Sequence, residues 1–297
     1  MGNLKEIRSR ITSVKSTRQI TSAMKMVSAA KLKKAQDAVI NLRPYANKLI
    51  VILQNIYRSI EGEGENIYCR KSLSDEKILI VAITSNKGLC GAFNANVIKQ
   101  VTTLINENYI DDVKKGNVSI VSFGKKGTEY FHSKGYKLAF YNNEILDKLS
   151  FENALPLIEQ IMGLFEKKLV DKIILVYNKF KNAGVQVLTS EQFLPIELFI
   201  DKDNEDQISD NFDYIFEPTK EYIVQELIPK SLRIKLYESL LESLAAEHGA
   251  RMTAMHKATD NASEMIKELQ LNYNKARQAS ITNEILEIVG GAEALRK

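Results

Sequence analysis

The sequence predicts an α/β protein in which two long terminal helices pair as an antiparallel coiled coil and flank a central sheet domain. Apolar residues recur at alternating steps of three and four at both ends of the chain. Between the ends, apolar and β-branched runs alternate with helical segments. The chain has 297 residues, 44% of them hydrophobic, which is enough to bury a large core. We therefore divide it into residues 1–60, 61–229 and 230–297.

The first part is predicted to be one long helix. From its middle onward, apolar residues follow one another at steps of three and four without a miss: Leu32, Ala35, Val39, Leu42, Ala46, Leu49, Leu53, Ile56 and Ile60. Extended backwards, the same register falls on Leu4, Ile7, Ile11 and Val14. A repeat of about 3.5 residues keeps one face of a helix toward a partner helix, which predicts a coiled-coil seam.

The seam changes its chemistry between these two stretches. Its positions there are Arg18, Thr21, Lys25 and Ser28, whereas the apolar face is carried by Ile20, Met24 and Val27. We therefore expect the surface that meets a partner to change character along this stretch. Because Pro44 lacks a backbone N–H, a kink or a local loss of hydrogen bonding is expected over 41–44.

The last part is predicted to be a second long helix, beginning after Pro229 and stopping near Gly290-Gly291. Its stripe begins with Leu241 and Leu244 and settles into Met252, Met255, Thr259, Ala262, Ile266, Leu269, Tyr273 and Ala276. Gly249 lies inside this helix and is compatible with it, because a glycine there costs only about 1 kcal/mol of helix stability relative to alanine. Both helices leave the same middle domain, so antiparallel pairing with each other is the economical way to bury their seams.

The central part alternates strands and helices, which is typical of a Rossmann-like, mostly parallel sheet with covering helices. We expect strands over residues 77–85, 118–123, 136–141, 172–180 and 185–194. Helices are expected over 95–108, 125–134 and 151–169. Gly184 fits a hairpin turn, so the last two strands are predicted to pair antiparallel. We expect 201–213 to be a solvated acidic loop and 61–65 to be a linker.

Charge is unevenly distributed along the chain. The net charge of +4 is the sum of +10 over residues 1–60, −7 over 61–229 and +1 over 230–297. A basic helix beside an acidic domain suggests separate partners. Nucleic acid is not expected, because the basic residues are spread around the helix and no aromatic residue precedes Tyr45. No stretch approaches the ~18–20 apolar residues of a spanning helix.

A glycine turn follows the first predicted strand, where phosphate-binding loops are found in α/β folds. Its sequence SNKGLCGAFN (85–94) has neither the P-loop spacing nor the G-x-G-x-x-G spacing. We therefore predict a structural turn around Lys87, Gly88 and Gly91 rather than a nucleotide site. The start of the following helix and Lys87 would still suit an acidic group of a partner.

No catalytic constellation, metal site or cofactor is predicted. Cys90 has no histidine near it in the sequence, and His132, His248 and His256 are scattered. The last two histidines lie eight residues apart, which is too far for an i, i+4 zinc pair. Two cysteines, Cys69 and Cys90, cannot make a disulfide framework, so a reducing compartment is expected.

The two ends and the glycine turn together resemble the gamma subunit of the rotary ATP synthase. The N-terminal match is KEIRSRITSVKSTRQITSAMKMVSAAKLKK, residues 5–34. The C-terminal match covers 250–291, with the family's spacing at Ile281-Thr282, Glu284, Glu287, Gly291-Ala292 and Ala294. The turn KGLCGAFN is the third match, and the order and separation of all three agree with the family.

This resemblance implies a torque-transmitting rotor and not an enzyme. The helices would form a coiled coil inside a ring of alternating alpha and beta subunits, with catalysis in the beta subunits. The sheet domain would stand on the c-ring beside the epsilon subunit, so proton flow through the ring turns the shaft. The chain would be peripheral to the cytoplasmic face of a bacterial plasma membrane, since no transit peptide is visible. It also lacks the cysteine pair of the redox-switchable chloroplast form.

Carried over residue by residue, the resemblance implies contacts with beta subunits at Met24, Arg251, Gln278, Thr282 and Glu284. A small or apolar helix end suited to turning in a sleeve is offered by Leu286, Ile288, Val289, Ala292 and Ala294.

Asn86 stands where the family usually has Asp before Lys-Gly, and a neutral Asn can still cap the helix turn.

The alternative function is a nucleotide-binding α/β enzyme with coiled-coil arms. That alternative requires nucleotide binding by the isolated chain, and loss of binding in the variant Gly88→Val.

Overall fold

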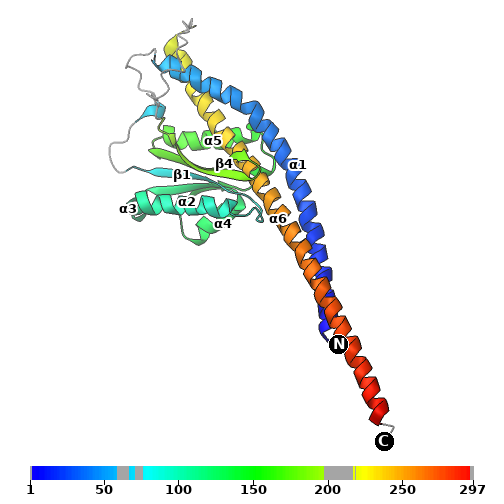
Figure 1. Cartoon of the computed structure of the whole chain (residues 1–297). Coiled ribbons are helices and arrows are strands. Elements are labelled where there is room, and N and C mark those ends of the chain that lie inside the picture. Colours follow the sequence, from blue (N-terminus) through cyan, green and yellow to red (C-terminus); the bar gives the residue numbers. More distant parts are fainter. Residues whose placement is uncertain (1, 59–66, 71–75, 197–216, 218, 295–297) are drawn as a thin grey trace. The chain divides into compact units, whose positions relative to one another are not determined.

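The computed structural model describes residues 2–58, 67–70, 76–196, 217 and 219–294 (Figure 1). These residues form two compact units. Unit 1 combines Met1–Ala30 with Arg251–Lys297, and unit 2 is Lys31–Ala250. Two long helices, α1 (Gly2–Arg58) and α6 (Lys220–Ala294), contribute to both units.

Unit 2 contains a five-stranded sheet with the order β3-β2-β1-β4-β5. The strands are β1 (Ile78–Ile83), β2 (Val118–Phe123), β3 (Leu138–Asn142), β4 (Lys172–Asn182) and β5 (Val185–Leu194). The first four are parallel, and β5 is antiparallel to β4 through a hairpin. Every residue of β1 is buried, as a central strand covered on both faces requires.

Helices cover both faces of this sheet (Figure 1). On one face, α2 (Phe93–Asn108) and α4 (Lys125–Ser133) pack on the apolar side chains of β1 and β2. On the other face, α5 (Phe151–Glu166) buries Ile158, Ile161 and Phe165 against β1, β2 and β4. A short helix that the sequence did not predict, α3 (Ile110–Lys114), follows α2, and 3-10 turns lie at Ile67–Cys69 and Ile145–Asp147.

Helix α6 is a second cover of the α5 face of the sheet. Leu232, Leu236 and Leu240 belong to the sheet core, whereas Ile234 packs on Ala46 and Leu49 of α1. Residues spaced four apart on α6 therefore face the sheet, whereas Ile234, which lies between Leu232 and Leu236, faces α1. From 231 to 250 no residue of α6 is exposed.

Unit 1 pairs the start of α1 with the second half of α6. Met255, Ala262 and Ile266 of α6 are buried, in agreement with the predicted stripe. On α1 the 3.5-residue register continues through the polar positions, because Thr21 and Ser28 are buried. The hydroxyl oxygens of Thr21 and Thr259 lie 2.9 Å apart, which joins the two helices by a hydrogen bond.

The apolar residues beside this register do not face the partner helix. Ile20 is 60% exposed and Val27 is 58% exposed. The seam between α1 and α6 therefore changes character along this stretch, as predicted: small polar residues continue it, while Ile20 and Val27 point outward.

The predicted fold class is confirmed, and the boundaries of α6 need correction. Pro229 lies inside α6, which begins at Lys220, and the helix continues through Gly290-Gly291 to Ala294. Pro229 is the tenth residue of this helix, so it has no N–H to donate to the carbonyl of Gln225, and the helix continues with one internal hydrogen bond fewer. Helix α1 continues through Pro44, where the kink stays a prediction. The linker 61–65 and the loop 201–213 lie outside the described residues.

Candidate functional site

The predicted site residues fall in two places. Lys87, Gly88 and Gly91 belong to the glycine turn between β1 and α2 in unit 2. The five predicted contact residues lie on α1 and α6 in unit 1.

The turn is anchored where β1 and β2 end side by side. The hydroxyl of Thr84 donates to the carbonyl of Phe123 at 3.1 Å and accepts from the N–H of Gly127 at 2.9 Å. A Cβ at Gly127 would lie 2.7 Å from that hydroxyl oxygen, so only glycine admits this approach. The start of α4 is thereby fixed to the end of β1.

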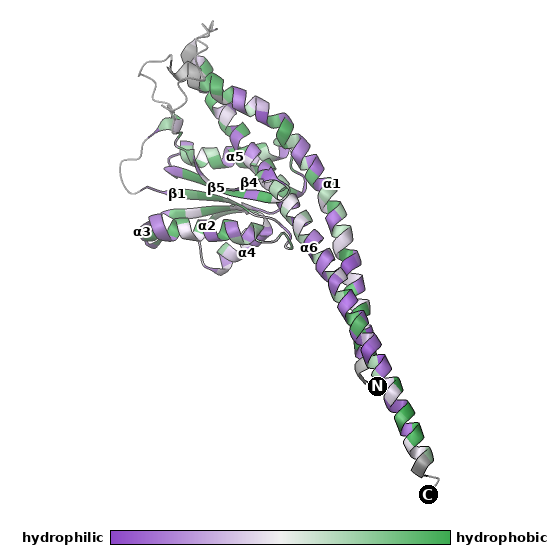
Figure 2. Ribbon diagram, in the orientation of Figure 1, coloured by the Kyte–Doolittle hydropathy of each residue, from purple (hydrophilic) through white to green (hydrophobic). Residues whose placement is uncertain are grey.

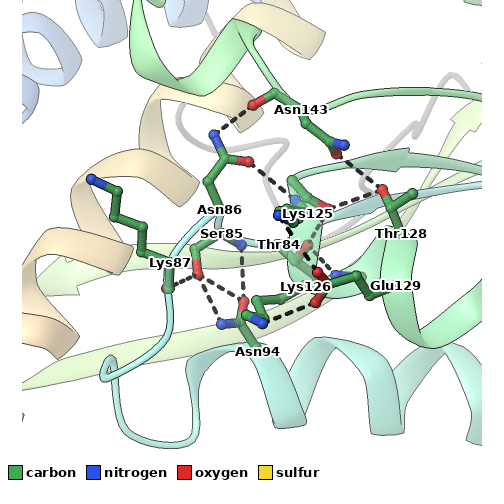
Figure 3. A network of polar contacts seen from close by, with 12 residues as sticks. Thr84, Ser85, Asn86, Lys87, Asn94, Lys125, Lys126, Thr128, Glu129 and Asn143 are labelled. Carbon is green, nitrogen blue, oxygen red and sulfur yellow. Dashed lines mark hydrogen bonds and ion pairs between the residues drawn. The ribbon is translucent and has the colours of Figure 1, made fainter.

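The interior of the turn is filled by its own side chains. The N–H of Ser85 donates to Asn94 Oδ1 at 2.9 Å, and Asn94 Nδ2 donates to Ser85 Oγ at 2.8 Å (Figure 3). Ser85 Oγ in turn donates to the carbonyl of Lys87 at 2.7 Å. Cys90 is buried beside this pair, within 3.3 Å of Asn94 Nδ2. Asn178 of β4 donates to the carbonyl of Phe93 and closes the cluster.

This filling argues against the alternative nucleotide site. A phosphate at such a turn would need free backbone N–H groups at the loop and at the start of the helix. Here the N–H of Ser85 is bound to Asn94, and the N–H of Phe93 donates to the carbonyl of Cys90 at 3.3 Å. Nothing in this geometry favours the enzyme interpretation.

The glycines of the turn differ in what they contribute. Gly91 has φ of +60°, a left-handed conformation that favours glycine. A Cβ at Gly88 would meet nothing within 4 Å, so space does not require glycine there. Leu89 between them also has a left-handed φ of 62° and is 64% exposed. Lys87 is exposed on the same turn.

Asn86 uses both ends of its amide. Its Oδ1 accepts from the N–H of Lys125, the first residue of α4, at 3.0 Å. Its Nδ2 donates to the carbonyl of Asn143, which follows β3 (Figure 3). The side chain of Asn86 therefore caps the start of α4. It does not cap α2, the helix that follows the glycine turn, and this corrects the expectation that Asn86 caps the turn before that helix. An ionised Asp could accept from Lys125 but could not donate to Asn143.

The five predicted contact residues are not brought to one place. Met24 is half-buried on α1, and Arg251 of α6 is only 7% exposed. Gln278, Thr282 and Glu284 are all exposed on the last turns of α6. The hydroxyl of Thr282 donates to the carbonyl of Gln278 at 2.9 Å, so toward a partner it offers chiefly its lone pairs.

An exposed apolar face surrounds these three polar residues. Its members are Ile281 (48% exposed), Ile285 (55%), Leu286 (63%), Ile288 (71%) and Val289 (54%). Figure 2 shows hydrophobic residues on the surface of this end of α6, and Figure 1 shows the helix continuing beyond the N-terminal end of α1. The sequence interpretation included three of the five. Ile281 and Ile285 were missed there, although their i, i+4, i+7 spacing with Ile288 could have identified them.

The titratable groups of the described chain show no cluster suited to catalysis. No group of three or more His, Cys, Asp or Glu that could hold a metal ion occurs among the described residues. Burial raises the pKa of the Cys69 thiol, which lowers its reactivity. No described helix has the length and apolar character needed to cross a bilayer.

The fold and these surfaces define a coiled-coil shaft joined to an α/β domain. A family model described as ATP synthase matches residues 3–295. The ATP synthase gamma chain of Christiangramia forsetii is 55% identical over 295 residues, covering 99% of each chain. The gamma chain of Flavobacterium johnsoniae is also 55% identical, over 99% of each chain. The chain therefore belongs to the family of ATP synthase gamma chains.

Solved structures agree with this family. A chain of the Tetrahymena thermophila mitochondrial ATP synthase central stalk and c-ring is 27% identical, with a TM-score of 0.56. It covers 80% of this chain and 99% of its own length. A chain of the Euglena gracilis mitochondrial ATP synthase, 23% identical with a TM-score of 0.68 over 99% of this chain and 95% of its own, shows the same fold. A gamma chain is the non-catalytic stalk subunit of its complex, which confirms the prediction that the chain is not itself an enzyme.

Proposed function

We propose that this chain is the central-stalk rotor of a bacterial F-type ATP synthase. It transmits torque between the proton-driven c-ring and the catalytic ring of alpha and beta subunits. Catalysis belongs to the beta subunits, and the chain binds no cofactor of its own. The proposal rests on family membership over the full chain and on the geometry of α6.

The observation that carries the proposal is the apolar end of α6. At 100° per residue, Ile281, Ile285, Ile288 and Val289 share a sector about 100° wide. All are exposed, and none of them has a partner helix among the described residues, because α1 begins opposite residue 278 by the Thr21–Thr259 register. Such a face requires a surrounding apolar surface. A ring of subunits supplies one without directional bonds, so the helix can turn inside it.

The proposed contacts with beta subunits fit this geometry unevenly. Gln278 lies inside the apolar sector and Thr282 at its border, so one surrounding surface would meet both. Glu284 accepts from the Ser280 hydroxyl at 3.4 Å and is exposed for a cationic partner. Met24 is half-buried, and Arg251, which is buried in unit 1, would act by shaping the helix surface.

The proposed partners are the alpha, beta and epsilon subunits and the c-ring, without nucleic acid. The Tetrahymena neighbour is described as part of a central stalk with a c-ring, and the Euglena neighbour as part of an assembly with F1 and a c-ring. The basic first 60 residues, with a net charge of +10, would be attracted to acidic segments of surrounding subunits through screened interactions. In this complex the chain is peripheral to the cytoplasmic face of the plasma membrane.

Co-purification tests the proposal. A tagged chain is isolated from detergent-solubilised membranes of its native cell, beside a tagged Leu269→Pro variant whose α6 seam is broken. We expect alpha, beta and epsilon subunits with ATPase activity from the native chain and not from the variant. Recovery of the chain alone, or with nucleic acid, would overturn the proposal.

A further inference from the structure

The β4–β5 hairpin of the sheet touches both long helices in unit 2. At its turn, a Cβ on Gly249 of α6 would lie 3.2 Å from the carbonyl oxygen of Ala183, so the helix and the hairpin approach closely there. Near its other end, Lys235 of α6 forms an ion pair with Glu191 of β5 at 3.2 Å. The two contacts are eight residues apart on the hairpin, which is about 26 Å of extended strand, and fourteen residues apart on α6, which is about 21 Å of helix. Because these lengths are similar, α6 runs along the hairpin.

The third contact joins three elements at one guanidinium group. Arg43 of α1 donates from Nη2 to the carbonyl oxygen of Phe180 in β4 at 3.0 Å. The same guanidinium donates twice to Glu242 Oε1 of α6, at 3.1 Å from Nε and 2.9 Å from Nη2. Phe180 is the last residue before the pairing of β4 with β5 shifts register. One side chain therefore bridges both shaft helices and the sheet.

Glu242 is a buried carboxylate that depends on Arg43 for its hydrogen bonds. Its side chain is 1% exposed, and its Oε2 makes no hydrogen bond among the described residues. Within the part of the chain that the structure describes, the Glu242 carboxylate accepts its hydrogen bonds from Arg43. Sliding α1 against α6 would leave a bare charge in the protein interior, which is strongly unfavourable. Apolar contacts resist separation but are non-directional, so they oppose sliding less.

We propose that the β4–β5 hairpin fixes the sheet to the shaft and that Arg43 is its positioning residue, bridging Glu242 and the Phe180 carbonyl. This inference rests on the proposed function as a rotor. A load applied to the sheet domain must reach the helices without slippage between them. The planar guanidinium suits this role because it holds two acceptors in a fixed geometry.

The test is made in the assembled complex in inverted membrane vesicles. The double variant Arg43→Met/Glu242→Leu removes both charges and keeps apolar volume, a replacement that folded proteins generally tolerate. We expect it to assemble and to hydrolyse ATP near the native rate, while protons pumped per ATP fall severalfold. Arg43→Lys keeps the charge without the fork and should give an intermediate ratio.

A matched control uses another arginine of the same unit. The side chain of Arg233 in α6 is as accessible as that of Arg43, at 37%, but the side chain of its partner Glu159 on α5 is 51% accessible, against 1% for Glu242. Arg233→Met/Glu159→Leu should leave the pumping ratio unchanged.

A native pumping ratio in the Arg43→Met/Glu242→Leu variant would overturn the inference. Loss of assembly in that variant would overturn it as well, since the pair would then serve folding rather than coupling. Failure of the proposed function is distinguishable, because in that case the native chain itself would not co-purify with a pumping ATPase.

Discussion

Helix α6 is enclosed along one stretch and bare along another. From 231 to 250 none of its residues is exposed, and from 281 to 292 all of them are. Both stretches carry large apolar residues, so composition does not separate them. The enclosed stretch also forms directional contacts through Lys235 and Glu242, whereas the bare stretch presents an apolar face. A shaft needs both properties: one region that cannot slip and one that can turn against its surroundings.

The largest expected effect comes from breaking the helix between these stretches. Leu269 is half-buried in the seam of unit 1. Leu269→Pro removes a helical hydrogen bond and introduces a clash, at about 3 kcal/mol or more, and it misaligns the seam. We expect no assembled complex in native gels of solubilised membranes. Leu269→Ala, which keeps the helix, should still assemble; an active complex with proline at 269 would contradict the continuous helix.

The difference in burial between the two stretches of α6 is tested by replacing one leucine with alanine in each stretch. Leu236 is fully buried against the sheet, and Leu286 is 63% exposed. Leu236→Ala should lower the free energy of unfolding of the purified chain by about 2–5 kcal/mol. Leu286→Ala should change it by no more than about 0.5 kcal/mol. Urea unfolding followed by circular dichroism measures both, and equal effects would mean that the two stretches do not differ as described.

A smaller effect on stability, but a specific effect on coupling, is expected at Met24. Met24→Lys places an ammonium group at a half-buried position on the proposed beta-contact surface. We expect the complex to assemble and protons pumped per ATP to fall. Met26→Lys, at a neighbouring residue that is 62% exposed, is the control. Normal pumping per ATP in the Met24 variant would argue against a role for this surface.

The smallest expected effect is a pH dependence within the enclosed stretch. Burial raises the pKa of Glu238 above its ordinary value of 4.5, and Glu242 acts in the same direction, while Lys235, Lys179 and Arg43 oppose it. A carboxyl with a raised folded pKa stabilises the fold most below its unfolded pKa, and that contribution is lost as pH rises through the folded value. Glu238→Gln should therefore increase stability near neutral pH.

Urea unfolding of native chain and variant across about pH 4 to 8, the range from the reference pKa of Glu to beyond neutrality, measures this difference. The gain should shrink toward the acid end. Glu226→Gln, at an exposed position of the same helix, is the control. Parallel curves for the native chain and the Glu238 variant would show that this carboxyl does not titrate as described.

Much of the fold follows from periodicity. The 3.5-residue repeat through Leu32, Val39 and Leu49 predicted buried positions correctly, since all three are buried. The β-branched runs predicted the strands, and β2 and β5 have the expected bounds. Gly184 predicted the antiparallel hairpin between β4 and β5. These features are local, so a single sequence contains them.

The rest depends on contacts between residues far apart in the chain. Leu232, Leu236 and Leu240 cover the sheet, but their spacing alone does not distinguish a second buried face from a solvated one. Asn86 caps α4, whose first residue is 39 positions away. A buried Glu242 would not be expected from composition, because charged residues are buried mainly where a partner such as Arg43 reaches them.

The Thr21–Thr259 hydrogen bond also has a consequence for synthesis. Its two residues are 238 positions apart, so α1 emerges from the ribosome long before its partner exists. At about 5–20 residues per second, the seam of α1 waits on the order of 10–50 s for α6. During that time its apolar stripe is open to other copies of the chain and to chaperones. A hydroxyl pair then favours one alignment of the seam, because a shift by one heptad would set Thr21 opposite Met252 or Ile266 and leave its hydroxyl without that bond.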